Sequence, residues 1–174
     1  MFETEAAAFE AVHWFKKVRT FVQESNRIGG ITRPPLKLEV NATVDFIALK
    51  EMDINALEVL VDVYAPGHIL RRHNGLDIHV GRHYPPPGGS NIEEELTELL
   101  RSIKEDADPT HLPRHFHKRY EDLHPFTDCN GRSGRALWAW CMLQDGQDPF
   151  SLPFLHRFYY QTLQYAPPLL HRRT

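Results

Sequence analysis

The sequence HPFTDCNGRSGR, at residues 124–135, brings reactive and flexible residue types together in one short segment. An imidazole, His124, and a carboxylate, Asp128, stand in a loop that leads into the helix-favouring stretch from Arg132 to Leu143. Free N–H groups at the start of a helix bind anions, and glycine lets a ligand approach the backbone closely. The segment therefore predicts an anion-binding loop followed by a helix.

Charged side chains in this segment narrow the chemistry. Arg132 and Arg135 share one face of the first helical turn and can hold phosphate oxygens. Asp128 is a hard oxygen ligand suited to Mg²⁺. His124 can accept a proton near neutral pH, as a general base must. These residues alone predict a site for phosphoryl or nucleotidyl transfer.

Residues 124–135 resemble the signature of the Fic family, H-x-F-x-D/E-G/A-N-G/K-R-x-x-R, and depart from it only at Cys129. The resemblance implies a mainly α fold, a Fic-type helical domain with a small β-hairpin flap. It also implies a protein adenylyltransferase that transfers AMP from Mg-ATP to a Tyr, Ser or Thr hydroxyl of a target protein, and of itself. ATP and Mg²⁺ are the implied substrate and metal.

The resemblance also assigns roles to individual residues. His124 would be the catalytic base and Asp128 the metal ligand. The nucleotide would be bound by the residues of the loop and the helix start, namely Asp128, Cys129, Asn130, Gly131, Arg132, Ser133, Gly134 and Arg135. A single domain over residues 1–174, with a family core at 55–166, is expected.

Two further segments extend the resemblance. Residues 77–85 look like the flap, where Ile78, His79, Val80 and Gly81 would contact the nucleotide and an extended target segment would add as a strand. A merely structural hairpin is the alternative. Tyr159 and Tyr160 stand where the family places a nucleotide-contacting tyrosine pair, although a buried core pair would give the same pattern.

The end of the N-terminal helix, residues 5–30, resembles the family's inhibitory segment, S/T-x-x-x-E-G/N. Ser25 and Gly30 match, but Gly29 stands where the inhibitory Glu is usual. In the family that Glu pairs with the second signature arginine, here Arg135, so a de-repressed enzyme is implied. A second register, Thr20 to Glu24, keeps a Glu but lacks the following Gly or Asn.

Hydrophobic spacing predicts helices along most of the chain. The expected helices are 5–25, 44–50, 55–64 (capped by Asp53), 91–103 (opened by Asn91), 114–121, 132–143 and 155–165, with a connector at 28–41 and an extended stretch at 78–84.

Composition excludes several classes of protein. The chain has 174 residues, enough for one well-buried core, and 20 Lys plus Arg against 23 Asp plus Glu. A formal charge of −3 gives no electrostatic footprint for nucleic acid, and no apolar run approaches a membrane span. The two cysteines, Cys129 and Cys141, form no secreted disulfide framework, so we expect a cytoplasmic protein. The expected partner is a hydroxyl-bearing target protein, without nucleic acid or membrane, and homodimer formation stays open.

Other functions compete with adenylyl transfer. Relatives of the resembled family transfer another phospho-group, remove AMP, or act as the toxin of a toxin–antitoxin pair, and a non-catalytic nucleotide-binding regulator is a further alternative. A zinc hydrolase built from His111, His115, His117 and His124 is disfavoured, because Pro113 interrupts the pattern and His117 falls on another helix face.

Overall fold

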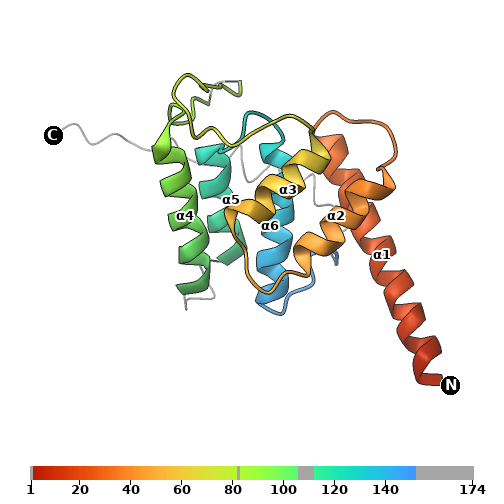
Figure 1. Ribbon diagram of the computed structural model, residues 1–174. Coiled ribbons are helices and arrows are strands. Elements are labelled where there is room, and N and C mark those ends of the chain that lie inside the picture. The colour runs from red at the N-terminus through yellow and green to blue at the C-terminus, as the bar shows by residue number, and fades with distance from the viewer. Residues whose placement is uncertain (1, 82, 106–111, 152–174) are drawn as a thin grey trace.

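The computed structural model describes residues 2–81, 83–105 and 112–151, which form a mainly helical domain (Figure 1). Its elements are α1 (Phe2–Ile28), α2 (Lys37–Ile47), α3 (Ile54–Tyr64), α4 (Ser90–Glu105), α5 (Leu112–Leu123) and α6 (Asn130–Gln144). The predicted helix at 155–165 lies outside the described residues. None of the helices in the described part of the chain is both long and apolar enough to cross a membrane.

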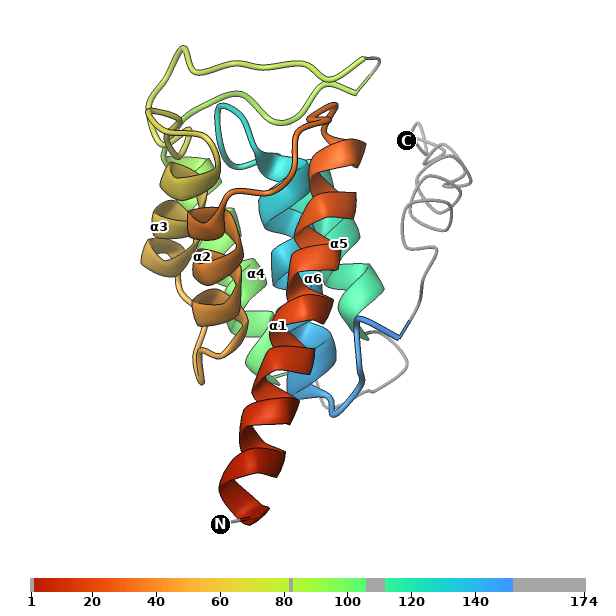
Figure 2. The same ribbon diagram turned by 90° about the vertical axis from the view of Figure 1, so that its right-hand side faces the viewer.

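Helix α6 is the centre of the fold. It is contacted by α1, α2, α3 and α5, while α4 packs on the far side of α5. Leu137, Trp140 and Ala136 of α6 are buried, together with Leu57 of α3 and Phe116 of α5. Figures 1 and 2 show that the loops α3–α4 and α5–α6 and the C-terminal end of α1 lie at the same end of the bundle.

Helix α1 ends at Ile28 and is followed by two glycines, Gly29 and Gly30. Gly30 has φ +80°, in the left-handed region that glycine adopts without cost. The N–H of Ile31 donates to the Asn26 carbonyl (2.8 Å) and that of Gly30 to the Arg27 carbonyl (3.0 Å), the hydrogen-bond pattern of a Schellman motif. This helix end directs residues 25–30 toward the start of α6.

The prediction of a connector over residues 28–41 was wrong in its second half, because α2 begins at Lys37 rather than at Val44. The N–H of Leu36 donates to the carboxylate of Glu39 (2.7 Å), so an acidic side chain three residues on satisfies the helix start. The N-cap residue is Leu36, whose side chain has no oxygen that could accept a hydrogen bond, so the Ser, Thr, Asp or Asn that usually marks a helix start is missing from the sequence.

Two other helix starts give a mixed result. The predicted cap of α3 is confirmed, because the Ala56 N–H donates to Oδ1 of Asp53 (2.8 Å). The predicted role of Asn91 was wrong, since α4 begins at Ser90 and Asn91 lies within its first turn. The Ile92 N–H donates to the Gly89 carbonyl (3.1 Å), which starts the helix before Asn91.

The structure does not show the small β-hairpin flap expected at residues 77–85. The described residues there form one isolated antiparallel bridge, in which Val80 and His83 exchange two N–H···O bonds of 2.9 Å. Gly81, with φ +61°, provides the turn between them. Beyond Tyr84 the run from Pro85 to Pro87 has no N–H groups with which to extend the pairing.

Candidate active site

A hollow of about 390 Å³ lies between the α3–α4 loop and the α5–α6 loop. Its lining residues come from both loops and the start of α6 and are Asp77, Ile78, His79, Val80, His124, Thr127, Asp128 and Asn130. The predicted base, the predicted metal ligand and three of the predicted flap residues therefore meet at one place. Gly81 lies beyond them at the turn.

The hydrogen bonding of His124 fixes the state of its ring. Nδ1 lies 3.0 Å from the Glu121 carbonyl oxygen, which can only accept, so Nδ1 carries the proton and Nε2 keeps a free lone pair. Burial lowers the pKa of His124, and the nearby charge of His83 and Arg71 acts in the same direction. The imidazole is therefore neutral at physiological pH and can accept a proton through Nε2.

Two residues of the α5–α6 loop, His124 itself and Cys129, have unusual backbone conformations. His124 has φ +50° and Cys129 has φ +68°, both left-handed conformations that are uncommon for residues with a side chain. The side chain of Asn130 holds the loop closed, because Oδ1 accepts from the Phe126 N–H (2.8 Å) and Nδ2 donates to the Phe126 carbonyl (2.7 Å). The side-chain amide of Asn130 is thus engaged with the loop itself.

Cys129, at the position where the resembled signature has Gly or Ala, precedes the first residue of α6 in a left-handed conformation that suits glycine. Burial raises the pKa of its thiol to about 11, so the thiol is uncharged at neutral pH and does not repel an anion. The N–H groups of Asn130 and Gly131, at the start of α6, have no intrahelical acceptor by position. The helix start thus keeps the features of an anion site.

Arg132 lies buried at the start of α6 with its guanidinium incompletely partnered. Its Nη1 is 3.9 Å from Oε1 of Glu39 and has no hydrogen-bond partner among the described residues. The guanidinium carbon lies 5.3 Å from the centre of the Tyr64 ring, a cation–π contact. A buried guanidinium nitrogen without a partner is costly, and a phosphate oxygen would satisfy it.

Arg135 contacts the end of α1 instead. Its Nε donates to Oγ of Ser25 (2.8 Å) and its Nη2 to the Ser25 carbonyl (2.9 Å). A Cβ atom added at Gly29 would lie 3.9 Å from Cδ of Arg132. The segment that resembles the inhibitory pattern therefore lies against both signature arginines: Ser25 contacts Arg135, and a Cβ at position 29 would lie near Arg132.

Asp128 extends into solvent at the mouth of the hollow, with 63% of its side chain exposed. Its Oδ1 accepts from the Cys129 N–H (2.6 Å), and its Oδ2 lies 3.9 Å from Nε2 of His68. Nδ1 of His68 is 3.2 Å from Oγ of Thr127. Sequence reasoning missed His68, whose position is set by the α3–α4 loop.

The remaining predicted residues fall into three groups. Ser133 and Gly134 are buried between helices: the Ser133 hydroxyl bonds that of Tyr120 (2.8 Å), and Gly134 lies against the Tyr120 ring. Tyr159 and Tyr160 lie outside the described residues. Of the four histidines considered for zinc, His111 lies outside the described residues. Among the described residues, no group of three or more His, Cys, Asp or Glu side chains is placed to hold a metal ion.

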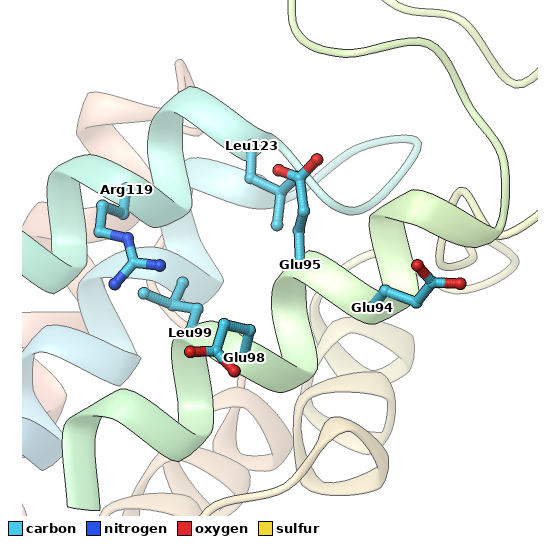
Figure 3. Close-up of a pocket in the computed structure, with 6 residues that line it drawn as sticks. All are labelled: Glu94, Glu95, Glu98, Leu99, Arg119 and Leu123. Carbon is cyan, nitrogen blue, oxygen red and sulfur yellow. The ribbon is translucent and has the colours of Figure 1, made fainter. Parts of the chain in front are cut away.

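Another hollow, of about 310 Å³, lies between α4 and α5 (Figure 3). It is lined by Glu94, Glu95, Glu98, Leu99, Arg119 and Leu123, and its glutamates come from α4 and its arginine from α5. None of the residues predicted for catalysis or nucleotide binding lines it. The candidate site is therefore the hollow that His124 and Asp128 share.

Together, the helical fold and this hollow place a neutral histidine and an acidic residue beside a helix start of the kind that binds phosphate. The chain belongs to the Fic/DOC family, whose sequence model matches residues 48–142. It is 31% identical over 137 residues to "Protein adenylyltransferase Fic" of Culex quinquefasciatus and 32% identical over 137 residues to the protein of that name of Aedes aegypti. Each alignment covers 73% of this chain and 27% of the relative.

A nematode relative matches a shorter part of the chain. "Protein adenylyltransferase fic-1" of Caenorhabditis elegans is 31% identical over 94 residues, which cover 51% of this chain and 18% of the relative. The chain thus spans about a quarter or less of the length of these curated relatives.

Proposed function

We propose that this chain is a protein adenylyltransferase that transfers AMP from Mg-ATP to a hydroxyl side chain of a protein. The observation that carries the proposal is the Nδ1–H bond of His124 to the Glu121 carbonyl, which leaves Nε2 as a proton acceptor beside Asp128 and the start of α6. The names of the aligned relatives support the choice of AMP as the transferred group.

The residues present fit a magnesium–triphosphate. Asp128 offers an exposed carboxylate at the hollow, and Mg²⁺ typically takes one or two carboxylates together with substrate phosphates and water. Arg132 offers a buried Nη1 without a hydrogen-bond partner among the described side chains. Bound Mg²⁺ would neutralise the charge on the phosphate oxygens during transfer.

In the proposed reaction the target hydroxyl oxygen attacks the α-phosphorus of ATP. Its proton passes to Nε2 of His124, the bond from the α-phosphorus to the bridging oxygen breaks, and pyrophosphate leaves. Arg132 and the free N–H groups at the start of α6 hold phosphate oxygens. An extended segment of the target would lie along residues 78–81, three of which line the same hollow as His124.

The proposal is tested by following the label from ATP. With α-³²P-ATP, Mg²⁺ and cell lysate, we expect more labelled protein than in the same lysate without the enzyme. With γ-³²P-ATP we expect the enzyme to add labelled pyrophosphate but no labelled protein beyond that of the enzyme-free lysate. His124→Ala should lower the labelling rate about 10²- to 10⁴-fold, the usual contribution of a general base, while the thermal unfolding temperature stays near that of the wild type. Label from the γ position alone would show a kinase, and removal of AMP from a pre-modified protein without transfer would show the reverse activity.

The enzyme is further proposed to be de-repressed at Gly29. A Cβ at this position meets nothing closer than the Asn26 carbonyl oxygen (3.4 Å), so the helix end has room for a side chain. A carboxylate there would lie beside Arg132, and Arg135 is already held by Ser25 of the same segment. This carboxylate would compete with the triphosphate for Arg132.

Gly29→Glu tests this second step, with Gly29→Gln as the uncharged control of the same length. A charge-assisted hydrogen bond contributes roughly 1.5 to 3 kcal/mol, so we expect Gly29→Glu to slow labelling about 10- to 100-fold. Gly29→Gln should slow it much less. Glu24, the candidate of the other register, pairs with Arg27 (2.7 Å), so Glu24→Gly should leave the rate unchanged. A rise in rate with Glu24→Gly, and no effect of Gly29→Glu, would establish the other register instead.

A further inference from the structure

Arg71, in the α3–α4 loop, is fully buried and no carboxylate accepts a hydrogen bond from it among the described residues. Its guanidinium donates instead to four backbone carbonyl oxygens, those of Leu76 (3.2 Å), Pro86 (2.9 Å), Leu123 (2.9 Å) and His124 (2.8 Å). A buried cation usually pairs with an anion, and here Asp77 contributes a Coulombic interaction but accepts no hydrogen bond from Arg71, so the four carbonyl contacts call for an explanation beyond charge pairing.

The four carbonyls belong to two separate segments. Leu76 and Pro86 stand at the two ends of the stretch that carries the hollow-lining residues 77–80, while Leu123 and His124 end α5 and begin the loop of the candidate base. The main chain of Arg71 connects the same two segments: its N–H donates to the Pro125 carbonyl (2.8 Å), and its carbonyl accepts from the Gly89 N–H (2.9 Å). One residue thus joins both walls of the hollow.

The conformation of His124 needs such support. Its φ of +50° is a left-handed conformation that costs an L-residue roughly 1 to 2 kcal/mol, and such strain persists only where the surroundings determine it. The carbonyls at the end of a helix also lack intrahelical partners and favour a nearby cation. The Arg71 fork satisfies two carbonyls next to each other at the turn from which the His124 side chain departs.

We propose that Arg71 is a positioning residue that fixes the proposed base His124 relative to residues 77–80, which line the opposite side of the hollow. Arg71 lines neither the nucleotide site nor the hollow, so it acts through the backbone of these segments. The inference rests on the proposed catalytic role of His124, which it deepens.

Arg71→Lys is the informative variant, because a lysine keeps the charge and the apolar stem but cannot donate to four carbonyls in fixed directions. Arg72→Lys is the matched control: it changes the neighbouring residue in the same way, and half-buried Arg72 forms ion pairs with Glu58 (2.9 Å) and Glu93 (3.6 Å) outside the hollow. For each variant we would measure thermal unfolding, ATP affinity by calorimetry and the maximal labelling rate at saturating ATP.

For folded Arg71→Lys we expect ATP affinity within about threefold of the wild type and a maximal rate lowered about 10- to 100-fold, because small displacements of a catalytic group cost that much. Arg72→Lys should keep the wild-type rate. A folded Arg71→Lys with the wild-type rate, or with a loss due entirely to weaker ATP binding, would overturn the proposal. If neither Arg71→Lys nor Arg71→Gln folds, Arg71 builds the core and the positioning role is rejected.

A second readout separates this inference from the proposed function. Histidine side-chain NMR spectra, with the His124 signals assigned by loss in His124→Ala, should show those signals shifted in Arg71→Lys and unshifted in Arg72→Lys. Unshifted His124 signals in the folded Arg71→Lys variant would reject the positioning role, whether or not the wild type labels protein from α-³²P-ATP. Absence of wild-type labelling together with shifted signals would reject the proposed function and retain the link between Arg71 and His124.

Discussion

At the scale of single residues, the site depends on protonation states that neighbours impose. The Glu121 carbonyl selects the His124 tautomer, and burial keeps that ring neutral. Burial likewise keeps the Cys129 thiol protonated next to the expected phosphate. Both pKa shifts come from the positions of the side chains in the fold, and neither could be inferred from the residue type alone.

The pH dependence of labelling should report the lowered pKa of His124. A general base works in its unprotonated form, so a pKa below the usual value of about 6.5 extends activity to lower pH. We expect the acidic inflection of the maximal labelling rate to fall below pH 6.5, measured at saturating Mg-ATP across a pH series. ATP affinity measured over the same series separates titration of the nucleotide from that of the enzyme. An inflection at or above pH 6.5 would contradict the buried environment described for the ring.

At the scale of elements, the site depends on how closely α5 and α6 approach. Gly134 of α6 lies against α5, where an added Cβ would be 2.5 Å from Oε1 of Glu121 and 2.9 Å from Cδ1 of Tyr120. The Nδ1–H of His117 donates to the Gly134 carbonyl (3.0 Å), which adds a polar tie at the same point. The loop between these helices carries His124, so their spacing sets where the imidazole lies.

Gly134→Ala should therefore destabilise the protein. Overpacking a buried contact costs typically 1 to 3 kcal/mol, and we expect a loss of about that size in the free energy of unfolding by urea. Gly29→Ala is the matched control, since a Cβ there meets no atom closer than 3.4 Å. It should change stability by less than about 1 kcal/mol. An equal effect of the two substitutions would show that the interhelical spacing is not what Gly134 provides.

At the scale of the whole molecule, three segments distant in sequence meet at one end of the bundle. The end of α1 holds Arg135 through Ser25, the α3–α4 loop holds the His124 turn through Arg71, and α6 provides the anion-binding start. This meeting buries ionisable groups, among them His117 and Glu39. Global stability should therefore depend on pH.

Burial, together with the charge of Arg135, lowers the pKa of His117 to about 3. The unfolded imidazole takes up a proton below about pH 6.5 while the folded one does not, so stability falls as the pH drops from about 6.5 toward 3. One such proton gives a slope of up to about 1.4 kcal/mol per pH unit, to which the lowered pKa of His124 adds in the same direction. Salt-bridged Glu39, whose pKa is lowered, loses its contribution only in the more acidic carboxylate range.

His117→Gln, which keeps a donor for the Gly134 carbonyl, should flatten this dependence between about pH 6.5 and 4.5, measured by urea unfolding at several pH values. The same substitution at exposed His115 should leave the slope as in the wild type. A wild-type stability that stays constant over that range would show that protonation of buried histidines does not oppose folding here.

The sequence by itself determined the family, the helical class and the loop that carries His124 and Asp128, because a short signature and the helical spacing of apolar residues are local properties. It also identified the Asp53 cap, a contact within one turn. It missed the early start of α2, where the carboxylate of Glu39 satisfies a helix start that has no capping side chain of its own. It also predicted strand pairing at 77–85, for which the structure has one bridge.

Only the tertiary structure decided which of these segments meet. The place of Gly29 next to Arg132, the contact of Ser25 with Arg135 and the Arg71 fork all join residues far apart in the chain. No local pattern marks Arg71, since its acceptors are backbone carbonyls that every sequence possesses. The lowered pKa of His124 likewise depends on burial, which exists only once the α3–α4 loop, α5 and α6 have packed around the ring.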